Sequence, residues 1–183
     1  MATSDAAKAA AFAKTGKRVT EFCATCHGEN GNSKKSDIPN LAGQNVTYVF
    51  EQMRKFINGE RNDETHSKFM GRLLKAMTED ERAAAAYHYS REKTVAARTV
   101  AGPLAAAGQA IYTARCLQCH GDKGLGAEII PRIAGQQPQY LKISLDRYRK
   151  KSGARQFATM SEAVGTLSDR DIDGVVDYLS SLQ

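Results

Sequence analysis

The stretch CATCHGENG, residues 23–31, decides the fold of this chain, because it occurs a second time as CLQCHGDKG at residues 116–124. Both copies contain the pattern C-x-x-C-H, and together they account for all 4 cysteines. IPNLAGQNVTY from Ile38 likewise corresponds to IPRIAGQQPQY from Ile130, and MTEDERAAAAYHYS from Met77 to LSDRDIDGVVDYLS from Leu167. The offset drifts from 93 to 92 to 90 residues, as small gaps require. The chain is therefore a tandem duplication of a unit of roughly 90 residues.

The segment between the two units, SREKTVAARTVAGPL at residues 90–104, lacks a strong apolar period and ends in Gly102-Pro103-Leu104. Such a segment is typical of a linker. We therefore expect two domains, at residues 1–96 and 97–183, with a linker at about residues 91–104. Units this small bury little core by themselves, so a covalently attached apolar cofactor would help to hold each one together.

The spacing of apolar residues predicts helices throughout the chain, and no strand pattern competes with it. Helices at about residues 6–22 and 105–112 lead into the two C-x-x-C-H motifs, and a helix with an apolar stripe follows each AGQ. Thr78 and Ser168 are predicted N-caps of the last helix in each unit, with Glu81 suited to a capping box. The predicted fold class is all-α.

Composition and charge argue against a nucleic-acid partner. With 42% hydrophobic and 25% charged residues, the chain resembles an ordinary soluble globular protein. Its net charge of +6 is spread out, and a nucleic-acid site would need a denser basic stripe. We therefore expect no nucleic-acid partner, although a basic cluster is suited to an acidic protein partner. The cluster comprises Arg147, Arg149, Lys150 and Lys151.

The N-terminal sequence MATSDAAKAAAFAK lacks the apolar core of a secretory signal. No run of 18 or more apolar residues predicts a membrane span, which leaves only peripheral membrane association open. Either the protein is cytoplasmic, or the chain is a form from which a leader has been removed.

The C-x-x-C-H motif is the pattern of c-type haem attachment. Two cysteines three residues apart lie on one side of a helical turn, where thioether bonds can hold a haem and the next histidine can bind its iron. A thioredoxin-like motif would need a βαβ context, and a four-cysteine zinc site needs neither the histidine nor a separate repeat around each pair. We predict two covalently attached haem c groups, held by Cys23, Cys26, Cys116 and Cys119, with His27 and His120 as proximal iron ligands.

The second iron ligand follows by elimination in the second unit. After His120 there is no further histidine and a single methionine, Met160. Methionine opposite histidine is the ligand set that raises the haem potential in electron-transfer cytochromes. At the offset of 90 residues, Met160 corresponds to Met70, which is the predicted ligand of the first unit. His66, four residues earlier, is its main competitor.

Other candidate ligands are predicted to be packing residues. Met77 corresponds to Leu167 and Met53 to Leu145, both core-like positions, and His88 is expected to be a partly buried helix residue.

Pro39 and Pro131 follow the histidines by twelve and eleven residues, so a carbonyl there could accept the imidazole Nδ1–H. A proline that simply ends a loop fits this spacing equally well. Tyr48 and Tyr140, in the middle helices, could pack on the haem or reach a propionate.

A family resemblance adds to these predictions. C-x-x-C-H-G, then I-P-x-[LI]-A-G-Q, then a late methionine before an [LM]-[ST]-x-x-[DE] helix start resemble the class I cytochromes c. Two such units in 183 residues resemble the dihaem cytochrome c4 family, and RNDETHSKFMGRLLKAMTEDE at residues 61–81 is similar to its pattern around the axial methionine. The resemblance covers nearly the whole chain.

The resemblance implies two all-helical haem domains related by a pseudo-two-fold axis, with the haem edges facing each other. It also implies a periplasmic protein whose leader has been cleaved. The family's ligand roles correspond to His27 with Met70 and His120 with Met160, and its proline carbonyl role corresponds to Pro39 and Pro131.

The sequence also departs from the family's pattern. Arg82 and Ala83–Ala86 replace bulkier apolar residues in the last helix of the first unit, a change that could loosen the first domain or alter its interface. The segment FMGR is similar to the dihaem subunit of flavocytochrome c sulfide dehydrogenase.

The resemblance implies one-electron transfer in a respiratory chain, between a quinol-oxidising complex and a terminal oxidase, and no enzymatic activity of its own. As an alternative, the chain would be the electron-accepting subunit of a sulfur-oxidising enzyme, flavocytochrome c sulfide dehydrogenase or thiosulfate dehydrogenase. A third class, a peroxidase-like dihaem enzyme, would need one iron with an open coordination position.

Overall fold

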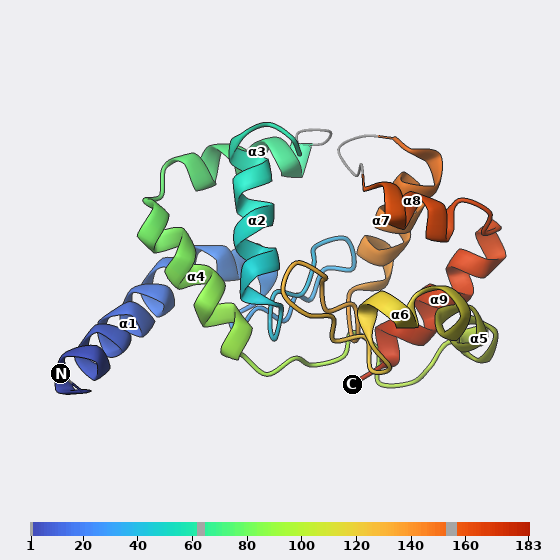
Figure 1. Ribbon diagram of the computed structural model, residues 1–183, viewed down its shortest axis with the longest axis horizontal. Helices are drawn as coiled ribbons and strands as arrows, with labels where there is room; N and C mark the ends of the chain where they lie inside the picture. The colour runs from blue at the N-terminus through green and yellow to red at the C-terminus, as the bar shows by residue number, and fades with distance from the viewer. Residues whose placement is uncertain (1, 62–64, 153–156) are drawn as a thin grey trace.

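A computed structural model of the chain describes residues 2–61, 65–152 and 157–183. This part of the chain folds into helices and loops without a strand, which confirms the predicted all-α class. The first half forms the left side of Figure 1 and the second half the right side. The helices of the first half are α1 (Ala2–His27), α2 (Val46–Ile57), α3 (Thr65–Lys75) and α4 (Glu79–Arg91). Those of the second half are α5 (Ala105–Arg115), α6 (Leu117–His120), α7 (Pro138–Lys150), α8 (Ala158–Val164) and α9 (Asp169–Ser181).

Helix bounds differ from the sequence prediction in two ways. Helix α1 runs from Ala2 through the whole first motif to His27, beyond the predicted residues 6–22. In the second half the corresponding helix is interrupted at Cys116, so that α6 carries the rest of the motif. Helices α3 and α8, which carry Met70 and Met160, were not predicted at all. Within the described residues, no helix is both long enough and apolar enough to cross a membrane.

The first and last helices of each half cross closely. A Cβ atom added to Gly16 of α1 would lie 2.5 Å from the Ala84 carbonyl oxygen of α4. A Cβ atom added to Gly108 of α5 would lie 1.9 Å from the Gly174 carbonyl oxygen of α9. Small residues thus let the two backbones touch. The run Ala83–Ala86 includes three alanines with no exposed surface, so in α4 it serves a close crossing.

Both final helices begin with the predicted caps. The Thr78 hydroxyl accepts the Glu81 backbone N–H while the Glu81 carboxylate accepts the Thr78 N–H, which completes a capping box. Ser168 and Asp171 form the same box at the start of α9. The caps fix where the helix begins directly after each methionine-bearing helix.

Each half has its own apolar core, and the second is the larger. The first core contains Val49, Met53, Leu74, Ala85 and Ala86. The second contains Tyr112, Leu141, Leu145, Val164, Leu167, Ile172, Val175, Val176 and Leu179. Met53 and Leu145 are buried in corresponding places, and Met77 packs against the first core, as their predicted roles require.

Candidate haem sites

The two motif histidines have the same surroundings. His27 ends α1 and His120 ends α6, and both are buried. The Nδ1 atom of His27 lies 2.9 Å from the Pro39 carbonyl oxygen, and that of His120 lies 3.0 Å from the Pro131 carbonyl oxygen. A carbonyl only accepts, so Nδ1 carries the proton and Nε2 keeps a free lone pair.

Burial also sets the charge of these histidines. Desolvation lowers the pKa of His27 and of His120, and the hydrogen bonds to the proline carbonyls oppose this only in part. Both imidazoles are therefore neutral at physiological pH. A neutral imidazole with a free Nε2 is the form that binds a metal.

The first cysteine of each motif lies about one helical turn before its histidine, and the second lies directly before it. Burial raises the pKa of Cys23, and raises the pKa of Cys116 to about 11, so these thiols are uncharged at neutral pH. Zinc requires thiolates gathered in one shell. Within residues 2–61, 65–152 and 157–183, no three His, Cys, Asp or Glu side chains are grouped to hold a metal ion. The four-cysteine zinc alternative is therefore not supported.

The predicted methionine ligands lie in corresponding helices. Met70 of α3 is half-buried and packs against the first core, and Met160 of α8 is half-buried against the second. His66, on the same helix as Met70, is exposed. His88 is half-buried in α4, as predicted, where its Nε2 atom lies 3.5 Å from a Glu92 carboxylate oxygen.

An arginine supports the segment after each methionine, and sequence reasoning missed both. The Arg82 guanidinium donates to the Leu74 and Met77 carbonyls, where the second half has the apolar core residue Ile172. In the second half Arg149 donates to the Leu167 carbonyl at 2.9 Å, and Leu167 corresponds to Met77. Two arginines from different helices thus reach equivalent carbonyls.

Arg149 was predicted to belong to a basic docking cluster, and the structure gives it another role. Its guanidinium also lies 2.7 Å from a carboxylate oxygen of Asp146 and 2.6 Å from one of Asp169. With only 16% of its side chain exposed, it serves the fold of the second half. Lys150 and Lys151 are exposed.

Loops that follow the two motifs meet at the centre of the molecule, where Figure 1 shows them between the two halves. The Tyr48 backbone N–H donates to the Glu128 carbonyl at 3.1 Å, and the Tyr140 N–H donates to the Ser36 carbonyl at 2.9 Å. Both pairs correspond at the offset of 92 residues, which makes the interface two-fold. Tyr48 and Tyr140, predicted to contact the haem, are thereby half-buried beside the opposite half.

Two glutamines complete this two-fold interface. The Gln44 side chain accepts the Arg132 backbone N–H at 2.7 Å and donates to the Arg132 carbonyl at 2.8 Å. The Gln136 side chain accepts the Asn40 N–H at 2.6 Å and donates to the Asn40 carbonyl at 3.0 Å. Sequence reasoning used the repeated AGQ only for alignment, although a polar residue kept in both copies was a signal for such a role.

The donor set fits a haem in each half. Each half provides two cysteines, a neutral histidine with a free Nε2 and a partly buried thioether. In addition, the buried Nε atom of Arg132 has no hydrogen-bond partner among the described residues, and desolvation lowers the pKa of this guanidinium. An anionic group such as a haem carboxylate would satisfy it.

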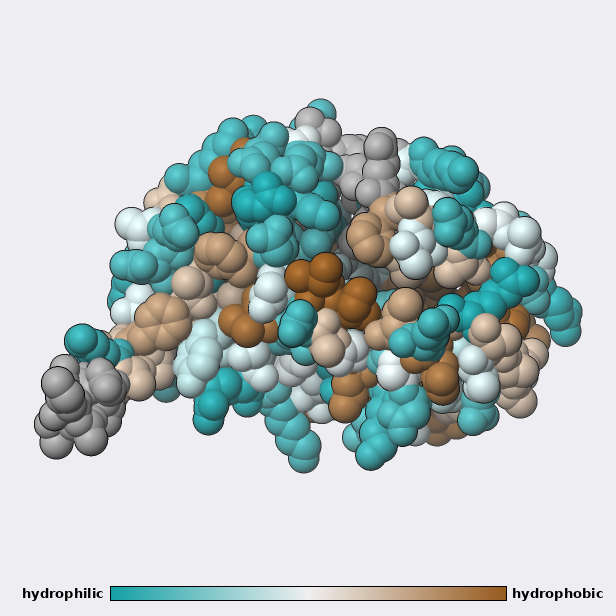
Figure 2. Space-filling view, in the orientation of Figure 1, coloured by the Kyte–Doolittle hydropathy of each residue, from teal (hydrophilic) through white to brown (hydrophobic). Residues whose placement is uncertain are grey.

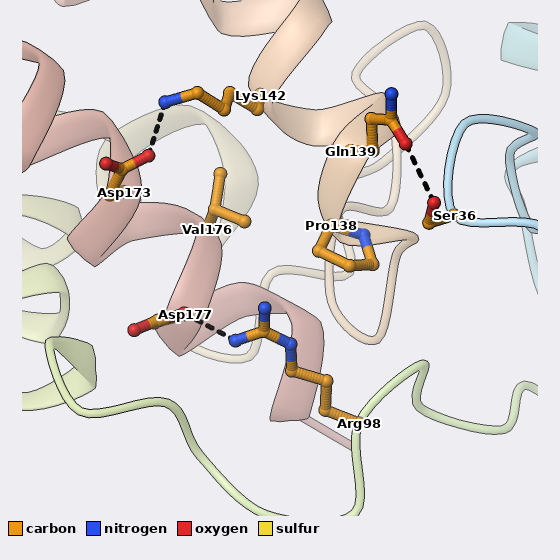
Figure 3. A pocket seen from close by; sticks show the side chains of 8 residues that line it. All are labelled: Ser36, Arg98, Pro138, Gln139, Lys142, Asp173, Val176 and Asp177. Atoms are coloured by element: carbon orange, nitrogen blue, oxygen red, sulfur yellow. Dashed lines mark hydrogen bonds and ion pairs between the residues drawn. The ribbon is translucent and has the colours of Figure 1, made fainter.

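A separate cleft of about 440 Å³ lies beside α7 and α9 of the second half, with Ser36 of the first half also lining it (Figure 3). Its charged groups are paired with each other, Arg98 with Asp177 and Lys142 with Asp173, and the Ser36 hydroxyl donates to Gln139 at 2.8 Å. None of the predicted haem residues lines this cleft. It is therefore separate from the cofactor sites.

On the face shown in Figure 2, hydrophobic residues gather at the middle, where the halves meet, and hydrophilic residues dominate the outer edges. The exposed large hydrophobic residues of the interface loops and their flanks include Val46, Leu125 and Ile129.

Comparison with known proteins agrees with the duplicated architecture. The cytochrome c family pattern matches twice, at residues 13–89 and 105–183. Cytochrome c4 from Pseudomonas aeruginosa is 30% identical over 96% of this chain and 91% of its own length. The structure of cytochrome c4 from Acidithiobacillus ferrooxidans superposes with a TM-score of 0.80 at 27% identity, covering 89% of this chain and 99% of that one.

A relative of a different kind is also similar. A thiosulfate dehydrogenase electron acceptor from Stutzerimonas stutzeri is 27% identical over 87% of this chain and 78% of its own length. With two matches in tandem and relatives that align along nearly its whole length, the chain belongs to the cytochrome c family and, within it, to the dihaem cytochromes c4.

Proposed function

We propose that this chain is a one-electron carrier in which His27 and Met70 bind one haem iron, and His120 and Met160 the other. A haem iron between imidazole and thioether cycles between its ferric and ferrous states at a raised potential. The observation that carries the proposal is the duplication of one donor set in both halves, down to the carbonyl that orients each histidine.

The remaining predicted residues have supporting roles. The cysteines of each motif, Cys23 with Cys26 and Cys116 with Cys119, attach the two haem c groups through thioether bonds. The Pro39 and Pro131 carbonyls fix the imidazole tautomer and raise its basicity. Tyr48 and Tyr140 pack on the haem or reach a propionate.

Burial favours Met70 over His66 as the sixth ligand. A thioether in a half-buried position against the core suits a ligand that must exclude water, whereas His66 is exposed. We propose domain limits of residues 1–96 and 97–183, and support for a boundary in this region comes from the end of α4 at Arg91 and the start of α5 at Ala105.

Two six-coordinate irons leave no position for a substrate, so the protein carries electrons and does not itself catalyse a reaction. We propose a periplasmic location, since the cytochromes c4 that it resembles imply one, with a quinol-oxidising complex as donor and a terminal oxidase as acceptor. A peroxidase-like activity would require a high-spin haem that reacts promptly with peroxide or carbon monoxide.

A second function is favoured by the similarity to thiosulfate dehydrogenase electron acceptors. Under it, the chain accepts electrons from the catalytic subunit of a sulfur-oxidising enzyme, of which it would be a subunit. Size-exclusion chromatography of the native protein separates the two functions, because only the second predicts a catalytic subunit or a flavin that co-purifies with the haem absorbance.

Substitution of the methionines tests the ligand assignment. In Met70→Ala and in Met160→Ala, we expect two haems per chain and loss of about half of the far-red methionine–iron absorbance, since each thioether serves one of two irons. Met77→Leu, which introduces the residue of the second half, is the control and should keep the full band. An undiminished band in Met70→Ala would exclude Met70 and direct attention to His66.

A further inference from the structure

The peptide group between Pro39 and Asn40 has hydrogen bonds at both ends. Its carbonyl oxygen accepts the Nδ1–H of His27 at 2.9 Å. Its N–H donates to the Gln136 side-chain oxygen, in the opposite half, at 2.6 Å. The Gln136 amide is held in this orientation because its nitrogen donates to the Asn40 carbonyl at 3.0 Å.

The second half repeats this arrangement with the halves exchanged. The carbonyl of the peptide group between Pro131 and Arg132 accepts the Nδ1–H of His120 at 3.0 Å. Its N–H donates to the Gln44 side-chain oxygen at 2.7 Å. Each histidine is thus linked through a single peptide group to a glutamine of the other half.

The chemistry of the peptide group makes this link more than a contact. When an amide N–H donates a hydrogen bond, electron density moves toward its carbonyl oxygen, which becomes a stronger acceptor. A stronger acceptor for the Nδ1–H makes the imidazole a stronger electron donor through Nε2. Both glutamines are at most 6% exposed, so water does not easily replace their oxygens if they are removed.

We propose that Gln136 tunes the reduction potential of the haem bound by His27, and that Gln44 tunes the potential of the haem bound by His120. Both are positioning residues that act across the interface through the Pro39–Asn40 and Pro131–Arg132 peptide groups. The inference rests on the proposed roles of the two histidines as proximal ligands. A stronger imidazole donor stabilises the ferric state, so each glutamine lowers the potential of the opposite haem.

Each glutamine is proposed to act on the haem of the opposite half, which distinguishes this effect from a local change in packing. Gln136 lies in the second half and packs there, directly before Gln137, whose N–H also donates to it at 2.9 Å. A substitution that merely disturbed its own half would change the haem of that half. The inference requires instead that the haem of the other half changes.

The test is a redox titration of the dihaem protein with Gln136→Met and Gln44→Met, neutral changes that keep side-chain length and remove the amide. The two haems are told apart by the NMR signal of the axial methionine methyl group that disappears in Met70→Ala. We expect about a twofold rise in the reduction equilibrium constant of the first haem in Gln136→Met and of the second haem in Gln44→Met.

A second readout follows the hydrogen bond directly. In the reduced protein, the Nδ1–H proton of His27 should resonate at lower frequency in Gln136→Met, because its bond to the Pro39 oxygen is weaker. Gln136→Glu restores an acceptor oxygen and should return the potential of the first haem to the native value or below it. Gln136→Leu provides a second neutral variant if Gln136→Met does not fold.

A change confined to the haem of the substituted half, an equal change at both haems, or no change at either would overturn the inference. Failure of the proposed function is distinguishable, since it is observed before any glutamine is changed. In that event the native protein would lack two low-spin haems with methionine–iron bands.

Discussion

Single side chains determine how the methionine-bearing segments are held. Arg82 has no counterpart in the pattern of the second half, where Ile172 fills the equivalent position of the core. Its guanidinium donates to the carbonyl of Leu74, in the last turn of α3, and to that of Met77, just after this helix. The two carbonyls that it reaches lie four and seven residues after Met70.

Replacing Arg82 with leucine should therefore weaken the first half only. Because a hydrogen bond from a charged donor contributes about 1.5–3 kcal/mol, we expect a loss of that order in the free energy of unfolding of the first half. The measurement is the loss of the far-red methionine–iron band on heating. In Arg82→Leu, the part of this band that belongs to the first haem should disappear at a lower temperature than in the native protein. Arg72→Leu, at an exposed position of α3, is the control. Equal stability of Arg82→Leu and native protein would contradict the role given to the guanidinium.

The sequence allows a prediction of the candidate haem-binding residues, whose side chains can bind a haem or its iron by their own chemistry. It does not reveal the residues whose role comes from hydrogen bonds to distant parts of the chain. The cysteines and histidines were found from local spacing, and the methionines from the repeat. Gln44 and Gln136 bond residues 88 and 96 positions away, and no local pattern encodes such pairs. In the sequence, Arg82 is visible only as a departure from an apolar position, because its carbonyl partners lie in α3 and in the turn that follows it.

Among the helices, α1 can cross α4 closely and α5 can cross α9 closely because glycine or alanine occupies the crossing points. These crossings could not be predicted, since periodicity gives the apolar face of a helix but not how near its partner comes. The caps could be predicted, because Thr78 and Ser168 act on residues three positions away. Helices α3 and α8 were not predicted, and α8 has only 7 residues, too few for a clear apolar period.

Gly108→Ala tests the second crossing. The new methyl group would lie 1.9 Å from the Gly174 carbonyl oxygen, so α5 and α9 must separate. We expect a loss of about 1–3 kcal/mol in the free energy of unfolding, measured by denaturant titration. Gln109→Ala, on the exposed side of α5, should leave stability nearly unchanged. A fully stable Gly108→Ala protein would show that the crossing is looser than described.

The capping boxes give a pH-dependent prediction. The Thr78 backbone N–H and then Arg18 hold the pKa of Glu81 below its ordinary value of 4.5, and Ser168 holds the pKa of Asp171 below 3.8. A carboxyl whose pKa is depressed by folding stabilises the protein above its unfolded pKa, and this stabilisation is lost as pH falls through the folded pKa.

Glu81→Ala and Asp171→Ala should each lower the free energy of unfolding at pH 7, because each removes the carboxylate that accepts the backbone N–H of its cap residue. The difference from the native protein should shrink as the carboxyl groups protonate in acid. Urea denaturation followed by circular dichroism at neutral and acidic pH measures both effects. A difference that stays constant across this range would argue against the capping carboxylates as its source.

At the scale of the whole molecule, the two halves are held by a buried, two-fold set of polar contacts. Besides the two glutamines, the Asn45 side chain donates to the Leu125 carbonyl at 3.2 Å, and the Gln137 side chain donates to the Ser33 carbonyl at 2.6 Å. These pairs also correspond at the offset of 92 residues. The duplication was evident in the sequence, but the interface was not, because each contact joins one copy to the other.

We expect the native protein to unfold in a single calorimetric transition. In a variant that combines Asn45→Ala with Gln137→Ala, each lost bond costs about 1 kcal/mol, and the halves should unfold in two separate transitions because their cores differ in size. Gln118→Ala, on the surface of α6, serves as the control. A single transition in the double variant would mean that other contacts suffice to couple the halves.

The proposed function requires that each half holds one six-coordinate haem and that the molecule carries electrons. A coulometric titration of the purified protein, followed by its visible spectrum with carbon monoxide present, tests it most directly. We expect two haems per chain, two one-electron steps and low-spin spectra that carbon monoxide leaves unchanged. Uptake of a single electron, or a haem that binds carbon monoxide at once, would contradict it.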